Sequence, residues 1–207
     1  MLINEYSLVD LFEKTIAAYA GAKYAVAVDS CSSALFLALM HCGAKNKQIS
    51  VPAKTYISVP CSIIHAGGTP AFNKQRWSGI YQLAPLPIVD GALRFTKNMY
   101  VKGTLHCLSF HIKKHLKIGK GGMILTDSIE AYKWLKLARY NGREGKDYMQ
   151  EQFKLVGWNC YMTPEDAARG LRIFKTLPAV NKDIKNDYQD LSKYKFASSG
   201  MEILHNE

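Results

Sequence analysis

Residues 23–43 read KYAVAVDSCSSALFLALMHCG, and the order of polar and apolar residues in this stretch decides the fold. Residues 23–29 form a short apolar run between polar ends, which is typical of a buried strand. A serine-rich turn follows at Ser30–Ser33, and an apolar helix is predicted from about Ala34 to Cys42. A strand that passes through a short turn into a helix is the repeating unit of α/β proteins.

The same alternation of strands and helices continues on both sides of this stretch. The first helix is predicted to begin behind Ser7 as N-cap and to end at Gly21. Further strands are predicted at Ile49–Pro52, Thr69–Phe72, Leu86–Val89, Leu105–Phe110 and Met123–Thr126, with a compact hairpin at Trp77–Pro87. Further helices are predicted at Thr55–His65, around Ala131–Ala138, from Pro164 behind the cap Thr163, and along Val180–Leu191. The chain is therefore predicted to be one α/β domain over residues 1–207, with a mostly parallel sheet flanked by helices.

The charge of the chain narrows the range of partners. The 207 residues include 27 Lys and Arg against 17 Asp and Glu, which gives a net charge of +10. Such a surplus favours anionic partners, which include nucleic acids, acidic membranes and phosphorylated small molecules. No block of consecutive like charges marks a nucleic-acid-binding tail, so nucleic acid is not the expected partner.

The apolar runs and the cysteines indicate in which compartment of the cell the protein is expected. The longest uninterrupted apolar run, Ala34–Met40, is far shorter than the ~20 residues that a membrane-spanning helix needs. Residues 1–5 do not read as the start of a secretory signal. The five cysteines form no C-x-x-C pair, which argues against a disulfide framework and against a metal cluster. The expectation is a cytoplasmic protein with no membrane contact and no metal site.

Polar side chains follow several of the predicted strands at their carboxyl ends, where open α/β sheets bind their ligands. Cys31 and Ser32 stand at the start of a helix, where free backbone N–H groups favour a phosphate. Asp90 follows one strand, Ser109 lies near the end of another, and Lys114 comes just beyond it. Each residue alone also has a structural interpretation, as a helix cap, a turn cap or a surface lysine.

Short blocks of sequence, the first of them Leu11–Glu13 and Tyr19–Val28, occur in a characteristic order between about residues 11 and 194. The most specific block is Ser109–Lys114, which reads SFHIKK. The others are Ser30–Leu35, Val51–Tyr56, Asp90–Ala92, Gly119–Gly122 and Gly157–Asn159. In this order they resemble the motifs of the DegT/DnrJ/EryC1/StrS family, the sugar aminotransferases that use pyridoxal 5′-phosphate (PLP), with Ser-Phe-His-x-x-Lys among them. The resemblance implies the large-domain fold of the type I PLP-dependent transferases, in a shortened form.

The resemblance also implies an activity. An amino group would move from an amino acid, glutamate by analogy, to a nucleotide-linked keto-sugar, and the surplus of positive charge suits that anionic substrate. Lys114 would hold PLP as an imine and would then act as the base that moves the proton. Asp90 would pair with the pyridinium nitrogen and keep it protonated.

The same resemblance implies the remaining contacts with the cofactor. Tyr56 would stack on the face of the ring. The backbone amides of Cys31 and Ser32, together with the hydroxyls of Ser32 and Ser109, would hold the phosphate. Asn159 would reach the phosphate of a neighbouring subunit, which implies a homodimer with shared active sites.

Departures from the family pattern keep other functions open. Leu93 stands where the family generally has Gln or His, and only 17 residues separate Phe72 from Asp90, too few for a crossover helix and an additional strand. The small C-terminal domain of the family has no counterpart in the expected organisation. The alternatives are a degenerate, non-catalytic homologue that binds PLP or a sugar nucleotide, a different PLP reaction such as dehydration, and a nucleic-acid binder.

Overall fold

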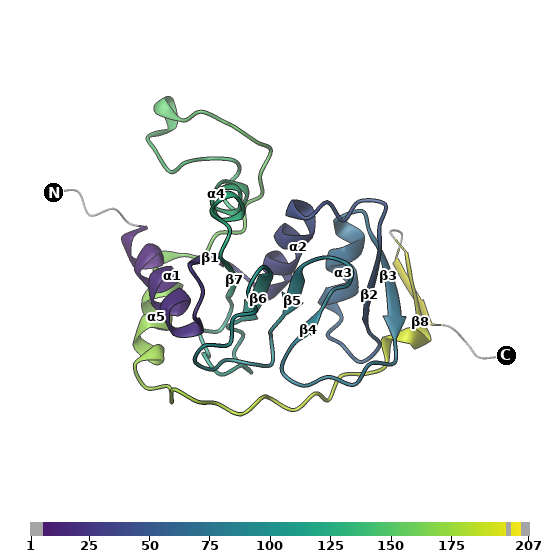
Figure 1. Ribbon diagram of the computed structural model, residues 1–207. Coiled ribbons are helices and arrows are strands. Elements are labelled where there is room, and N and C mark those ends of the chain that lie inside the picture. Colours follow the sequence, from purple (N-terminus) through teal and green to yellow (C-terminus); the bar gives the residue numbers. More distant parts are fainter. Residues whose placement is uncertain (1–5, 198–199, 204–207) are drawn as a thin grey trace.

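The computed structural model describes residues 6–197 and 200–203, and it has an α/β architecture (Figure 1). The main sheet has five strands in the order β1-β7-β6-β5-β4. These strands are β1 (Tyr24–Val28), β4 (Tyr81–Gln82), β5 (Ile88–Asp90), β6 (Leu105–Ser109) and β7 (Gly122–Thr126). The predicted α/β class is confirmed, and the apolar run at the start of the deciding stretch forms β1.

The directions of the strands differ from the prediction. β5 and β6 are parallel, but β1 and β7, β6 and β7, and β4 and β5 are antiparallel, so the main sheet is mixed. All five residues of β7 are buried because helices cover both faces of the sheet. An antiparallel strand in that position is as apolar as a parallel one, and its sequence therefore carries no signal of direction.

Helices cover both faces of the main sheet. They are α1 (Ser7–Ala20), α2 (Cys31–His41), α3 (Ser58–His65), α4 (Ile129–Ala138) and α5 (Pro164–Phe174). One apolar layer joins α1 and α5 to Ala25 and Ala27 of β1. The other joins α2, α3 and α4 to a layer that includes Val26 and Val28. Successive residues of β1 thus point to opposite faces, as the pleat of a strand requires.

The ends of these helices follow the residues that cap them. The Ser30 hydroxyl accepts a hydrogen bond from the N–H of Ser33 at 3.1 Å and begins α2. Thr163 caps α5 through its side chain, as predicted. The predicted cap Ser7 is wrong by one position, because Tyr6 is the N-cap and Ser7 is already helical.

A second, smaller sheet lies beside the main one. It contains β2 (Gln48–Pro52) and β3 (Thr69–Asn73), which are parallel. The N–H of Ser50 in β2 donates to the carbonyl of Ala84 at 2.7 Å, and this bond links the two sheets. Ala84 belongs to the connection between β4 and β5, whose antiparallel pairing confirms the predicted hairpin.

The predicted last helix, Val180–Leu191, is wrong. Residues 175–190, which we call the strap, run without a helix from α5 along the lower side of the molecule in Figure 1. The N–H of Ile184 donates to the carbonyl of Leu93 at 2.9 Å. Bonds of this kind to other parts of the chain satisfy backbone groups that a helix would have satisfied internally.

Beyond the strap, the described chain ends in a short turn and a hairpin. These elements are η2 (Leu191–Lys193), β8 (Tyr194–Ala197) and β9 (Gly200–Ile203). Residues 141–157, which we call the arm, extend away from α4 at the top of Figure 1 and include η1 (Tyr148–Gln150). Within residues 6–197 and 200–203, every helix is too short or too polar to cross a bilayer.

Candidate active site

Asp90 and Lys114 lie at or beyond the ends of β5 and β6, two strands that pair with one another in the main sheet. Asp90 is the last residue of β5 and only 4% exposed, and Lys114 lies half-buried in the loop after β6. Burial raises the pKa of the Asp90 carboxyl and lowers the pKa of the Lys114 amine. Attraction between the two charges opposes both pKa shifts, and burial outweighs it in each case.

Two neighbours hold the Asp90 carboxylate in place. Its Oδ1 accepts the N–H of Ala92 at 2.9 Å, and its Oδ2 accepts the hydroxyl of Tyr81 at 2.9 Å. The Tyr81 hydroxyl also hydrogen-bonds to Thr55. Tyr81 was not predicted as a site residue, because its position depends on a strand of two residues that places it opposite Asp90.

The turn before α2 lies against the ends of β6 and β7. Ser109 is opposite Gly122 in the register of these two strands. A Cβ atom on Gly122 would come within 2.4 Å of the Ser30 carbonyl and 2.6 Å of the Cys31 nitrogen. Glycine therefore allows β7 to pass directly beneath the turn, and it brings Ser109 close to the first amides of α2. Cys31 and Ser32 are the first two residues of that helix.

Lys114 has an aromatic neighbour that the sequence analysis did not assign to the site. The Lys114 amine donates a hydrogen bond to the Tyr188 hydroxyl at 3.1 Å. The ring centroid of Tyr188 lies 5.7 Å from that of Tyr56 and 6.4 Å from that of Trp77. Tyr188 belongs to the strap, and the 74 positions between it and Lys114 left no local signal of the contact.

Of the predicted site residues, Asn159 lies elsewhere. It follows the arm, its side chain is exposed, and its backbone bridges to that of Tyr140. Six of the predicted site residues lie at or just beyond the ends of β1, β2, β5 and β6, namely Asp90, Lys114, Cys31, Ser32, Ser109 and Tyr56. They supply an amine, a buried carboxylate, a helix N-terminus and an exposed aromatic ring. That set of groups fits the aldehyde, pyridine nitrogen, phosphate and ring face of PLP in chemical type.

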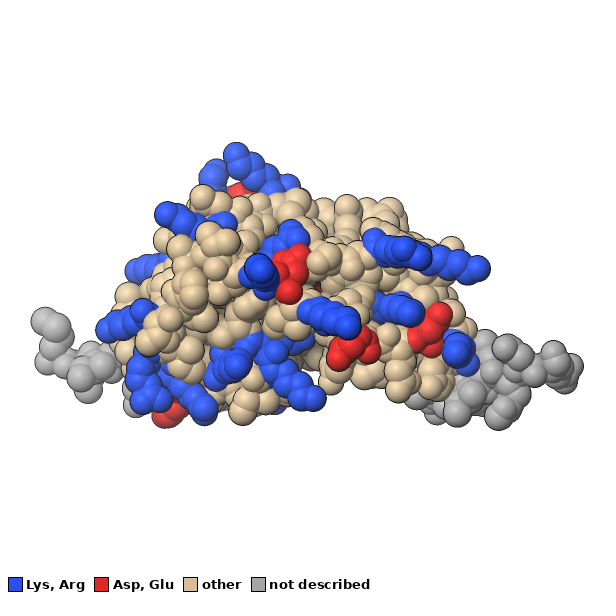
Figure 2. Space-filling view, turned by 90° about the horizontal axis from the view of Figure 1, so that it is seen from below, with Lys and Arg blue, Asp and Glu red and all other residues tan. Residues whose placement is uncertain are grey.

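The charge of the surrounding face suits an anion. Figure 2 shows the side of the molecule that the strap crosses, where Lys and Arg outnumber Asp and Glu. Lys113, Lys117 and Lys120, which follow β6, are all exposed. A positive face of this kind attracts phosphate-bearing ligands.

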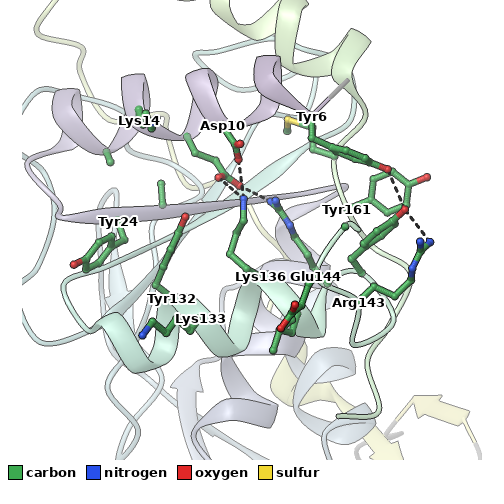
Figure 3. Close-up of a pocket in the computed structure, with 18 of the residues that line it drawn as sticks. Tyr6, Asp10, Lys14, Tyr24, Tyr132, Lys133, Lys136, Arg143, Glu144 and Tyr161 are labelled. Atoms are coloured by element: carbon green, nitrogen blue, oxygen red, sulfur yellow. Dashed lines mark hydrogen bonds and ion pairs between the residues drawn. The ribbon is translucent and has the colours of Figure 1, made fainter. Parts of the chain in front are cut away.

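A separate cavity of about 800 Å³ lies between α1, β1, α4 and the arm (Figure 3). None of the predicted site residues, all within the described part of the chain, lines it. Lys136 pairs there with Asp10 at 2.9 Å and with Glu13 at 3.0 Å, and Arg139 also pairs with Glu13. Glu13 and Arg139 bind the N–H and the carbonyl of Ala27 in β1. The network therefore stabilises the fold at this side of the sheet.

The model of the DegT/DnrJ/EryC1/StrS aminotransferase family matches residues 1–75 and 96–202. The chain is 26% identical over 235 aligned positions to the spore coat polysaccharide biosynthesis protein SpsC of Bacillus subtilis, covering 87% of this chain and 60% of that protein. It is 28% identical over 203 positions to the GDP-perosamine synthase of Caulobacter vibrioides, covering 77% of this chain and 54% of that protein.

Solved structures show the same fold. AtS13 from Actinomadura melliaura has a TM-score of 0.71 at 20% identity, covering 82% of this chain and 60% of that one. PseC of Helicobacter pylori, an aminotransferase involved in the biosynthesis of pseudoaminic acid, has a TM-score of 0.63 at 20% identity, covering 80% and 56%. The chain thus spans 54–60% of the length of these curated relatives and 56–60% of these structures. Asp90 lies in the interval between the two matched parts of the family model.

Proposed function

Because the chain belongs to the DegT/DnrJ/EryC1/StrS aminotransferase family, we propose that it transfers an amino group from an amino acid to a nucleotide-linked keto-sugar with PLP as cofactor. Glutamate is the proposed donor. The observation that carries this proposal is that the buried carboxylate of Asp90 and the half-buried amine of Lys114 end or follow two adjacent strands, next to the strand that lies against the N-terminus of α2. The match to a GDP-perosamine synthase supports a substrate carried on a nucleotide.

Lys114 and Asp90 carry the proposed chemistry. PLP supplies a ring that accepts the electrons of a substrate carbanion. The Lys114 amine would hold the cofactor through its aldehyde carbon and, as a free amine after the substrate amine has replaced it there, would move the proton of the substrate. Its lowered pKa increases the neutral fraction that both tasks need. Asp90, whose carboxylate Ala92 and Tyr81 hold in place, would keep the pyridine nitrogen protonated.

The other predicted residues have binding roles in this proposal. Cys31 and Ser32 give backbone amides to the phosphate, and Ser109 gives its hydroxyl. Tyr56, which is 53% exposed, offers its ring face to the cofactor. Asn159 serves the phosphate in a neighbouring subunit, in keeping with its exposed position after the arm.

A homodimer is the proposed assembly, and the arm is the proposed contact. Met149 and Val156 are 88% and 89% exposed, an unusual state for apolar side chains that face only water. Glutamate at both positions should shift sedimentation from dimer to monomer. Val180→Glu, a matched change at an exposed position on the strap, should leave a dimer. Five unpaired cysteines suit the cytoplasm as the proposed compartment.

The deciding test is a spectrum with added PLP, before and after borohydride. An absorbance band should form in the purified protein, and reduction should fix PLP on the peptide that contains Lys114. The band should vanish in Lys114→Arg and persist in Lys113→Arg, the adjacent matched control. Addition of glutamate should then bleach the band of the native chain. A spectrum without any protein-bound band would refute the proposal.

A non-catalytic PLP- or sugar-nucleotide-binding homologue is the second candidate. The short interval before Asp90 and the apolar Leu93, which is 2% exposed, favour it. It predicts a band that is fixed on Lys114 but remains unbleached by any amino acid. The same spectrum therefore separates the two candidates.

A further inference from the structure

The ring of Tyr188 lies in the part of the site where the proposed function needs a ring ligand. Its hydroxyl is 3.1 Å from the Lys114 amine, and its ring is 5.7 Å from that of Tyr56 between centroids. The carboxylate of Asp90 is near enough to raise the pKa of the Tyr188 hydroxyl, an effect second only to burial. A hydroxylated aromatic ring from the chain itself thus contacts the amine beside the buried carboxylate.

The strap is held so that Tyr188 stays there. Asp183 pairs with Arg94 at 2.7 Å and accepts the Ser78 hydroxyl at 3.0 Å. On the other side of Tyr188, the N–H of Leu191 donates to the carbonyl of Ala53 at 2.9 Å. Anchors on both sides of one residue fix its position, since the chain between them is short.

We propose that Tyr188 is an internal occupant of the ring site, and that the strap must withdraw before a ring-bearing cofactor reaches Lys114. This inference rests on the proposed function, because it assumes that the ring site binds PLP. The ring of Tyr188 and the ring of the cofactor would both occupy the space beside the same amine. The strap therefore competes with the cofactor, and withdrawal of the strap and binding of the cofactor are coupled.

Chemical labelling of Lys114 tests the inference without PLP. Formaldehyde with cyanoborohydride methylates accessible neutral amines, and mass spectrometry then reads each lysine separately. At pH 10.5, an ordinary lysine is about half neutral, so a fall in the pKa of Lys114 can speed its labelling by no more than about twofold. Tyr188→Ala should speed labelling of Lys114 by about tenfold, and Tyr188→Phe by about threefold, since the latter removes only the hydrogen bond.

Three controls accompany this measurement. Lys113 is exposed and should label at the same rate in every variant. Tyr148→Ala, a matched truncation on the arm, should leave the labelling of Lys114 unchanged. Asp183→Asn weakens an anchor without touching the ring site, so it should raise the rate in the same direction as Tyr188→Ala. Near-ultraviolet circular dichroism shows whether each variant keeps its fold.

A second measurement separates failure of this inference from failure of the proposed function. Tyr188→Ala should bind PLP more tightly than the native chain, by about tenfold. Equal labelling of Lys114 in the native chain and in Tyr188→Ala would overturn the inference, even if PLP binds to Lys114 in both. Faster labelling with no PLP on Lys114 in any variant would instead refute the proposed function and, with it, competition for PLP.

Discussion

The hydroxyl of Tyr81 donates a hydrogen bond to Oδ2 of Asp90 at 2.9 Å, opposite the Ala92 N–H that binds Oδ1. Tyr81→Phe should lower the free energy of unfolding at pH 7 by about 2 kcal/mol, because a buried carboxylate loses a donor. Urea titration measures the loss. Tyr132→Phe, which removes a hydroxyl on α4 far from Asp90, should change stability by much less. An equal loss in both variants would contradict this role of Tyr81.

Lys114 should react at lower pH than an ordinary lysine. Burial lowers the pKa of its amine from the usual 10.5, so its neutral fraction is larger at every pH below that value. The midpoint of its labelling by an amine-specific reagent should therefore lie below pH 10.5. Asp90→Asn should move the midpoint lower still, because the carboxylate charge raises the pKa of Lys114. An unchanged midpoint in Asp90→Asn would show that the two charges do not interact, and an upward shift would contradict the sign of their interaction.

His106 should make the fold sensitive to acid. Its ring is fully buried on β6, and burial lowers its pKa from 6.5 to about 4. As the pH falls through this window, the unfolded state takes up the proton first and the free energy of unfolding decreases. The contribution of His106 between pH 6.5 and 4 is about 3 kcal/mol. Urea titrations at pH 6.5 and pH 4 measure how much the free energy of unfolding decreases between them. The decrease should be smaller in His106→Gln than in the native chain by about 3 kcal/mol. An equal decrease in both proteins would exclude His106 as the cause.

Glu13 should matter far more to stability than Asp10, although both bind Lys136. The Glu13 side chain is 4% exposed and also pairs with Arg139, whereas that of Asp10 is 43% exposed. Glu13→Ala leaves a buried guanidinium without its partner and should cost about 3–5 kcal/mol. Asp10→Ala should cost less than about 1 kcal/mol. Thermal unfolding of the two variants measures the contrast, and similar costs would contradict it.

Much of the fold could be predicted from the sequence because its signals are local. The apolar run before Ser30 is enough to predict β1. The capping side chain of Thr163 and the proline after it are enough to predict the start of α5. The directions of the strands could not be predicted, since burial on both faces makes them alike in composition. The strap shows the other limit. Val180, Ile184, Tyr188 and Leu191 have helical spacing, yet bonds with distant residues such as Leu93 and Ala53 hold the chain extended.

In the candidate site, too, residues with a local sequence signal could be predicted, and residues that depend on tertiary contacts could not. Asp90, Ser109 and Lys114 stand directly at or after strand ends, so order along the chain was enough to group them. Tyr81 and Tyr188 reach the site through tertiary contacts, which cannot be predicted from the spacing of residues along the chain. The role of Asn159 is a prediction about a second subunit, and dimer measurements on the arm variants bear on it.

The hydrogen bonds from Glu13 and Arg139 to Ala27 also hinder edge-to-edge pairing of the sheet with another copy of the chain. β1 is an edge strand whose outer side bridges to Tyr161 at Val28, and the rest of that side offers a template for pairing with a strand from another chain. Two side chains already occupy the N–H and the carbonyl that such a strand would use at Ala27. Substitution of Glu13 would therefore leave the backbone N–H of Ala27 unpaired at the sheet edge, and the variant should aggregate as well as lose stability.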